Sequence, residues 1–158
     1  NDFLVNLLQH LDGNTLCLFQ LVEKHGKILN DKMKGSENVY FVYGGTDTSE
    51  REKIRGLVET HTNSTTIASY GTFSTGINIR NINNIVLASP SKSKIRVLQS
   101  IGRGLRTSST KDSVLVYDIA DDISYNERRN YTLNHFTERI NIYNEEQFNY
   151  EISRVKLK

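Results

Sequence analysis

A glutamine and two arginines recur at helical spacing within residues 99–106. At about 100° per residue, Gln99, Arg103 and Arg106 fall within roughly 60° of one another on a helix. One amide and two permanent cations on one edge suit a ligand rich in anionic oxygens, such as a nucleoside triphosphate. A basic helix face that is simply solvated would carry the same residue types, so the preceding segments must decide between the two interpretations.

Two further segments carry residue types that suit phosphate groups. In residues 43–46, Gly44 and Gly45 allow a ligand to approach the backbone, and the following helix offers amide donors. A tight turn without a ligand would explain these glycines equally well. Residues 69–78 are rich in hydroxyl groups and contain two glycines, so they can donate hydrogen bonds to a phosphodiester without reading bases. An ordinary polar loop is the alternative.

The composition describes a globular domain. With 158 residues the chain is long enough to bury a substantial core, and its net charge of +2 implies that any nucleic-acid surface is local. Cys17 lies in an apolar run and is expected to be a buried structural thiol, and the histidines form no evident metal cluster. No run is long enough to span a membrane and no signal peptide is evident, so we expect a cytoplasmic protein. Because the chain starts at Asn1 rather than Met, we expect it to be a fragment of a larger protein.

Short apolar runs alternate with segments of helical period, which predicts an α/β domain with a central, mostly parallel sheet between helices. The expected strands are residues 16–19, 39–43, 65–69, 85–88 and 114–118.

Three helices are expected, apart from the one that carries Gln99. The first spans residues 22–34, with Gly35 at its C-terminal end and an apolar stripe of Leu21, Val22, Ile28 and Leu29. The second starts after Asp47 in a capping-box pattern and turns Ile54, Leu57 and Val58 inward.

The third expected helix lies near the C-terminus. Leu133, Phe136, Ile140 and Tyr143 recur at helical spacing, which predicts an amphipathic helix over residues 126–144. Its apolar stripe suits packing on the core better than a groove for a partner. Residues 148–157 alternate weakly and suit either a closing strand or a tail against the sheet.

The three segments with residues suited to phosphate groups, 43–46, 69–78 and 99–106, should lie close together in the fold. In an open parallel sheet, ligands collect at the carboxyl ends of the strands, and each of these segments follows a predicted strand. Lys92, Lys94 and Arg96 add positive charge just before Gln99.

The order of these patterns resembles a known family. The patterns are Phe19-Gln20 ending a strand, the Tyr-Gly-Gly turn at 43–45, Ser-Thr-Gly-Ile-Asn at 74–78, and Gln-x-x-Gly-Arg-x-x-Arg at 99–106. They resemble motifs IV, V and VI of the second RecA-like domain of superfamily-two helicases, over nearly the whole chain. The resemblance implies a three-layer RecA-like domain in residues 1–125, with a C-terminal helix and tail in residues 126–158 packed on it.

The resemblance also implies roles for single residues. Arg103 and Arg106 would reach a triphosphate bound by a partner domain and neutralise charge on the transferring γ-phosphoryl group. Gln99 would sense that phosphate or position the attacking water. The residues expected beside the nucleotide are Gly76, Asn78 and Gly102. Those expected on the nucleic acid are Gly44, Gly45, Thr72, Thr75, Lys92 and Lys94.

Motif V departs from the common pattern of the family at its two ends. Ser69-Tyr70 stands in place of Ala-Thr, which puts the usual direct hydroxyl contact at position 70 in doubt. Asn78 stands in place of an aspartate, and it can hydrogen-bond a ribose or an arginine but cannot form a salt bridge.

The chain contains neither a Gly-x-x-x-x-Gly-Lys-Ser/Thr phosphate loop nor an Asp-Glu-x-His/Asp magnesium motif. The resemblance therefore implies that ATP and Mg²⁺ are bound mainly by an N-terminal RecA-like domain, without which this chain should be inactive.

Within the family, the resemblance is strongest to helicases that remodel branched DNA in phage recombination and repair. It implies branched double-stranded and single-stranded DNA as partners, with RNA–DNA hybrid as a further substrate. The alternatives are the motor domain of a restriction or DNA-translocating enzyme, and a non-catalytic RecA-like module that binds nucleic acid.

Overall fold

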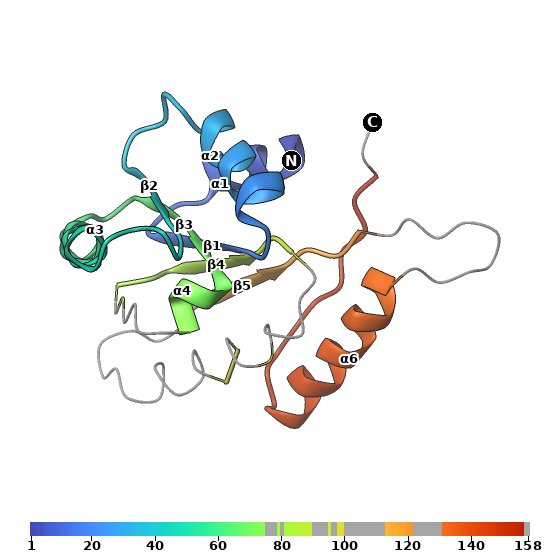
Figure 1. Ribbon diagram of the computed structural model, residues 1–158. Coiled ribbons are helices and arrows are strands. Elements are labelled where there is room, and N and C mark those ends of the chain that lie inside the picture. The colour runs from blue at the N-terminus through green and yellow to red at the C-terminus, as the bar shows by residue number, and fades with distance from the viewer. Residues whose placement is uncertain are drawn as a thin grey trace.

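The computed structural model describes residues 1–74, 79, 81–89, 95, 98–99, 113–121 and 131–156. Its centre is one parallel sheet with the strand order β2-β3-β1-β4-β5 (Figure 1). The strands are β1 (Thr15–Phe19), β2 (Val39–Val42), β3 (Thr65–Ser69), β4 (Asn84–Leu87) and β5 (Leu115–Asp118). The predicted α/β class and parallel sheet are confirmed.

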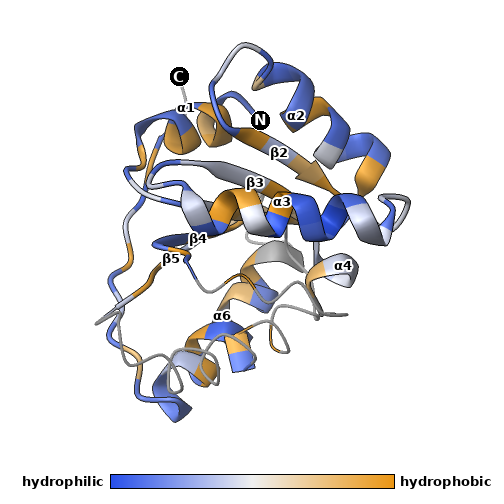
Figure 2. Cartoon of the chain, turned by 90° about the vertical axis from the view of Figure 1, so that its left-hand side faces the viewer, coloured by the Kyte–Doolittle hydropathy of each residue, from blue (hydrophilic) through white to orange (hydrophobic). Residues whose placement is uncertain are grey.

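Helices cover both faces of this sheet. They are α1 (Asp2–His10), the π-helix η1 (Val22–Gly26), α2 (Lys27–Lys32), α3 (Thr48–Thr60), α4 (Tyr70–Ser74) and α6 (Tyr131–Glu145). Figures 1 and 2 show α1 and α2 on one side of the sheet and α4 and α6 on the other. The molecule is therefore a three-layer domain.

The central strand β1 explains why the sheet is buried on both faces. All five of its residues are buried. Leu16 and Leu18 belong to the core cluster that α3 and α6 complete, whereas Cys17 and Phe19 belong to the cluster that α1 and α2 complete. A strand covered on both faces reads as a continuous apolar run, and this is why the run at β1 predicted a strand.

The helix predicted for residues 22–34 is two consecutive elements, η1 and α2. In η1 the Gly26 amide donates to the Leu21 carbonyl at 3.0 Å, a five-residue step that shifts the following helical face. Leu29 is therefore buried, whereas Leu21 and Ile28, which were expected to face inward, are exposed. Gly26 is required here, because a Cβ atom would lie 2.4 Å from the ring of Phe19. Gly35 adopts a φ of +97° shortly after α2 ends, as a glycine at a helix end commonly does.

Helix α3 starts after Asp47 as predicted, and Ile54 and Val58 are buried. Two details of the prediction were wrong: the Asp47 side chain makes no capping hydrogen bond, and Leu57 is 36% exposed. Helix α1 was not predicted, although Leu4 and Leu8, four residues apart, are both buried by it.

Helix α6 confirms residues 131–144 of the predicted amphipathic helix, and residues 126–130 lie outside the described residues. Tyr143 is buried and Ile140 packs against the same core cluster, which confirms that this face packs on the core. Residues 148–156 form no strand and are exposed, so the closing-strand alternative is wrong for them. The tail begins against α6, where the rings of Phe148 and Tyr150 lie 6.4 and 6.0 Å from that of Tyr143.

Candidate functional site

The connections between the strands define where a ligand should bind. From β1 the chain runs through η1 and α2 on one face to β2, whereas α3, between β2 and β3, lies on the other face. Strands β2 and β4 lie on opposite sides of β1, so the chain leaves β1 and β3 in opposite directions. Ligands of open α/β sheets bind at the carboxyl ends of strands where such a reversal occurs. The ends of β1, β3 and β4 therefore form the candidate site.

Ser89 joins these three strand ends. It follows β4 and is 6% exposed. Its Oγ accepts the Gln20 amide hydrogen at 3.3 Å, beyond β1, and lies 2.9 Å from Nδ1 of His25 in η1. Its carbonyl accepts a hydrogen bond from the Tyr70 hydroxyl at 3.1 Å, beyond β3. We call Ser89, Gln20, His25 and Tyr70 the Ser89 cluster.

Burial favours the neutral forms of the two titratable side chains in the Ser89 cluster. Burial lowers the pKa of His25, so its Nδ1 can accept the Ser89 hydroxyl proton while Ser89 accepts from Gln20. Burial raises the pKa of Tyr70, and its hydroxyl remains a donor. Position 70 is where the departure from the motif V pattern put a direct hydroxyl contact with a ligand in doubt. In the structure, the Tyr70 hydroxyl donates to the carbonyl of Ser89.

The start of the loop after β3 is also internally bonded. Thr72, predicted to contact nucleic acid, is 3% exposed, and its hydroxyl lies 2.7 Å from that of Ser69. The Thr72 amide also donates to the Ser69 hydroxyl at 3.4 Å. These bonds fix the first turn of α4 on the end of β3. A contact of Thr72 with nucleic acid stays a prediction.

The turn that contains Gly44 and Gly45 is organised by Arg51 of α3. The Arg51 guanidinium donates to the carbonyls of Thr46 at 2.8 Å, Gly44 at 3.0 Å and Tyr43 at 3.4 Å. Gly45 leaves room for the Tyr43 ring, since a Cβ there would lie 2.7 Å from it, whereas a Cβ on Gly44 would meet nothing. Both glycines are exposed, so this part of the backbone is accessible to a ligand.

A buried ion pair ties α6 to the carboxyl end of β5. Oδ2 of Asp118 accepts hydrogen bonds from Nε of Arg139 at 2.5 Å and from the Tyr143 hydroxyl at 2.6 Å. The Arg139 side chain is 3% exposed, and its guanidinium carbon lies 5.6 Å from the centre of the Phe136 ring. Within the described part of the chain, its two terminal nitrogens have no hydrogen-bond partner. This pair was not predicted, although the sequence contains its signals: an acid at the end of a strand, and Arg139 and Tyr143 at i, i+4 spacing.

Of the predicted catalytic residues, only Gln99 belongs to the described part of the chain. It is helical and exposed, beside Leu98, which is 3% exposed. This contrast agrees with the amphipathic helix that the spacing predicts. The other predicted site residues lie outside the described residues: Arg103, Arg106, Gly76, Asn78, Gly102, Thr75, Lys92 and Lys94.

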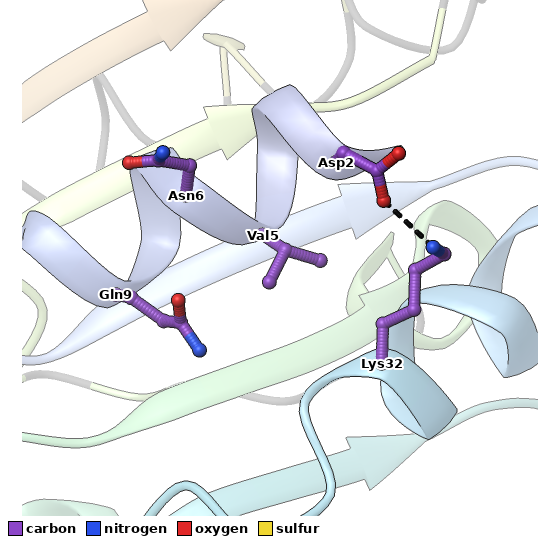
Figure 3. Close-up of a pocket in the computed structure, with 5 residues that line it drawn as sticks. All are labelled: Asp2, Val5, Asn6, Gln9 and Lys32. Carbon is purple, nitrogen blue, oxygen red and sulfur yellow. Dashed lines mark hydrogen bonds and ion pairs between the residues drawn. The ribbon is translucent and has the colours of Figure 1, made fainter.

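A hollow between α1 and α2 is separate from the Ser89 cluster (Figure 3). It is lined by Asp2, Val5, Asn6, Gln9 and Lys32, and the Lys32 ammonium lies 2.6 Å from a carboxylate oxygen of Asp2 across it. None of these is a predicted site residue, and the ion pair is exposed, so it contributes little to stability. Among the described residues, no group of three or more potential ligands could hold a metal ion. No helix in this part of the chain is long and apolar enough to cross a membrane.

Comparisons with known proteins agree with the fold. Residues 1–108 match the family model of the helicase conserved C-terminal domain. The ATP-dependent DNA helicase uvsW of Enterobacteria phage T4 is 39% identical over 95% of this chain, which spans 32% of that protein. The crystal structure of T4 UvsW superposes with a TM-score of 0.74 over 95% of this chain and 32% of that one, at 39% identity. The C-terminal part of the Fun30 ATPase domain shares the fold, with a TM-score of 0.60 at 14% identity over 91% of this chain and 53% of that one.

The family model covers well over half of this chain. The T4 relative supports the same assignment over 95% of this chain. The chain thus belongs to the family of the helicase conserved C-terminal domain.

Proposed function

We propose that this chain is the second motor domain of an ATP-dependent DNA helicase. The observation that carries the proposal is the 39% identity, over 95% of this chain, to a protein named as an ATP-dependent DNA helicase. Because the chain spans 32% of that relative, the activity would belong to a longer protein in which an N-terminal RecA-like domain supplies the phosphate loop. If the protein is encoded by a phage, it would act in the cytoplasm of the host cell.

The nucleotide would bind between the two domains. Arg103 and Arg106 would donate to the γ-phosphate of an ATP held mainly by the other domain, and Gln99 would sense that phosphate or orient the attacking water. Gly76, Asn78 and Gly102 would lie beside the nucleotide. Bound Mg²⁺ would neutralise phosphate charge, and its ligands would come mainly from the other domain. Exposure of Gln99 agrees with a surface completed by a second domain.

The nucleic-acid track would run over the carboxyl edge of the sheet. Gly44 and Gly45 are exposed there, and Arg51 holds the carbonyls of their turn on the side of α3. Thr72, Thr75, Lys92 and Lys94 would add contacts to phosphates, which hold the strand without reading its sequence. We propose branched DNA as the substrate, including forks, displacement loops, Holliday junctions and RNA–DNA loops, as the family resemblance of the sequence implies.

The proposal is tested by Arg103→Ala in the full-length protein. Steady-state ATP hydrolysis stimulated by forked DNA should fall by about 10³-fold or more, because an arginine on the transferring phosphoryl group contributes at least that much. DNA binding, measured by fluorescence anisotropy, should change little, and forked DNA should stimulate the wild type more than linear duplex does.

The matched control is Arg55→Ala in α3, where the half-buried Arg55 pairs with Glu52 and Glu59. It should leave hydrolysis unchanged. Hydrolysis retained in Arg103→Ala would contradict the assignment of the motor site.

A further inference from the structure

The Ser89 cluster lies where the sheet reverses its connections, and it bonds the segments after β1, β3 and β4 to one residue. Two of its three contacts, the Gln20 amide at 3.3 Å and His25 Nδ1 at 2.9 Å, come from the segment after β1, and the third, the Tyr70 hydroxyl at 3.1 Å, comes from the segment after β3. The hydrogen-bonding capacity of the Ser89 hydroxyl, one donor and two acceptor positions, permits the first two bonds together. The Ser89 side chain therefore links the end of β4 to the segment after β1, and its backbone carbonyl links the same end to the segment after β3.

One bond of the Ser89 side chain has a defined direction. The Gln20 amide can only donate, so Ser89 Oγ accepts from it. The donor in the bond between Ser89 Oγ and Nδ1 of His25 depends on the tautomer of the ring, and in either tautomer this bond holds the orientation of the ring. Alanine at position 89 would remove both bonds, while the backbone carbonyl that accepts from Tyr70 would remain.

Tyr70 extends the Ser89 cluster to the loop after β3. Tyr70 is 3% exposed and is the first residue of α4, whose first turn is held by the Ser69–Thr72 hydroxyl pair. The end of β4 thereby sets the position of the segment in which motif V begins. None of the predicted site residues belongs to the Ser89 cluster.

We propose that Ser89 is a positioning residue: it holds the segments after β1 and β3 in the relative placement that ATP turnover requires. The proposal rests on the helicase function proposed above. It assigns to Ser89 no contact with nucleotide or nucleic acid, only the alignment of the elements that make those contacts. Small misplacements of this kind can lower turnover by about 10- to 100-fold.

The test compares Ser89→Ala with Ser64→Ala in the full-length protein. Ser64 is an equally buried serine, 3% exposed, whose hydroxyl donates to Asn14 Oδ1 at 2.7 Å at the amino edge of the sheet. Each substitution removes a buried hydroxyl and should lower Tm by a similar few degrees. DNA-stimulated ATP hydrolysis at saturating forked DNA should fall by about tenfold or more in Ser89→Ala and stay near wild type in Ser64→Ala.

A third variant, Ser89→Thr, keeps the hydroxyl and should retain most of the wild-type turnover. The DNA concentration for half-maximal stimulation should change little in all three variants, since the phosphate contacts remain. Wild-type turnover in Ser89→Ala, or equal losses in Ser89→Ala and Ser64→Ala, would overturn the positioning role. A wild-type protein that does not hydrolyse ATP with any DNA would instead overturn the proposed function, so the two failures are distinguishable.

Discussion

The lowered pKa of His25 makes the stability of the domain depend on pH. Burial lowers the pKa of its imidazole from 6.5, against an opposing effect of Asp121. Below about pH 6.5 the unfolded chain therefore binds more protons at this position than the folded chain does, and acid favours unfolding. The stability lost to this residue should appear as pH falls from about 6.5 toward the folded-state pKa, and little should be lost above about pH 6.5.

We predict that His25→Gln reduces the fall in Tm between pH 7.5 and pH 5.5, because glutamine does not titrate. Thermal unfolding followed by circular dichroism at both pH values measures the difference. His10→Gln, which removes an imidazole from an exposed position on α1, is the matched substitution control. An equal pH dependence in wild type and His25→Gln would show that His25 does not titrate differently on folding.

Single residues also show what local patterns predict well. Cys17 lies between leucines in an apolar run, and it is fully buried as predicted, with burial raising its pKa to about 12. Ile28 and Leu57 are equally apolar, yet both are exposed. Hydrophobicity gives the tendency to be buried, but the face that a helix turns inward depends on packing partners distant in the sequence.

At the scale of elements, the strands were predicted to within one residue at their ends. Each strand is a short apolar run bounded by polar or glycine-containing segments, a signal contained in the strand itself. The π-helix η1 was not predicted; the close approach of the Phe19 ring to Gly26, which accompanies it, is a contact between two elements that a local pattern does not contain. The Ser89 cluster and the Asp118–Arg139 pair were missed for the same reason.

The buried Asp118–Arg139 ion pair, which joins α6 to β5, should stabilise the fold. Arg139→Met should lower the free energy of unfolding by about 3–5 kcal/mol, because breaking a buried ion pair by removing one partner is strongly destabilising. Asp118 would keep the Tyr143 hydroxyl bond, but its side chain is only 9% exposed. Urea unfolding of the two proteins measures the difference.

Arg55→Met is the matched control for this prediction, since it removes the same group from a pair in which the arginine side chain is 36% exposed. Such exposed pairs contribute about 0–1 kcal/mol, so this variant should be near wild type. Similar losses in Arg55→Met and Arg139→Met would mean that burial does not set the value of the Asp118–Arg139 pair.

At the scale of the whole molecule, the sheet order explains how distant segments of the sequence form one site. The segments after β1, β3 and β4 are separated by tens of residues, but the order β3-β1-β4 places them side by side. The position of each motif after a predicted strand indicated that the candidate ligand-binding segments lie at this edge of the sheet. The pairing of Gln20, His25 and Tyr70 on Ser89 could not be predicted, because it depends on strand order.

The charge of the molecule leads to a last prediction. A net charge of +2 attracts DNA only weakly, so the affinity must depend on a few local cations, and Lys92 and Lys94 are the candidates. Each lysine that neutralises a phosphate releases counterions, and its loss lowers the slope of log K against log salt by roughly 0.9 on duplex DNA. Lys92→Ala/Lys94→Ala in the full-length protein should therefore reduce the slope by about 1.8, whereas Lys53→Ala, at an exposed position on α3, should leave it unchanged. Anisotropy titrations at several salt concentrations measure these slopes, and an unchanged slope in the double variant would remove both lysines from the nucleic-acid track.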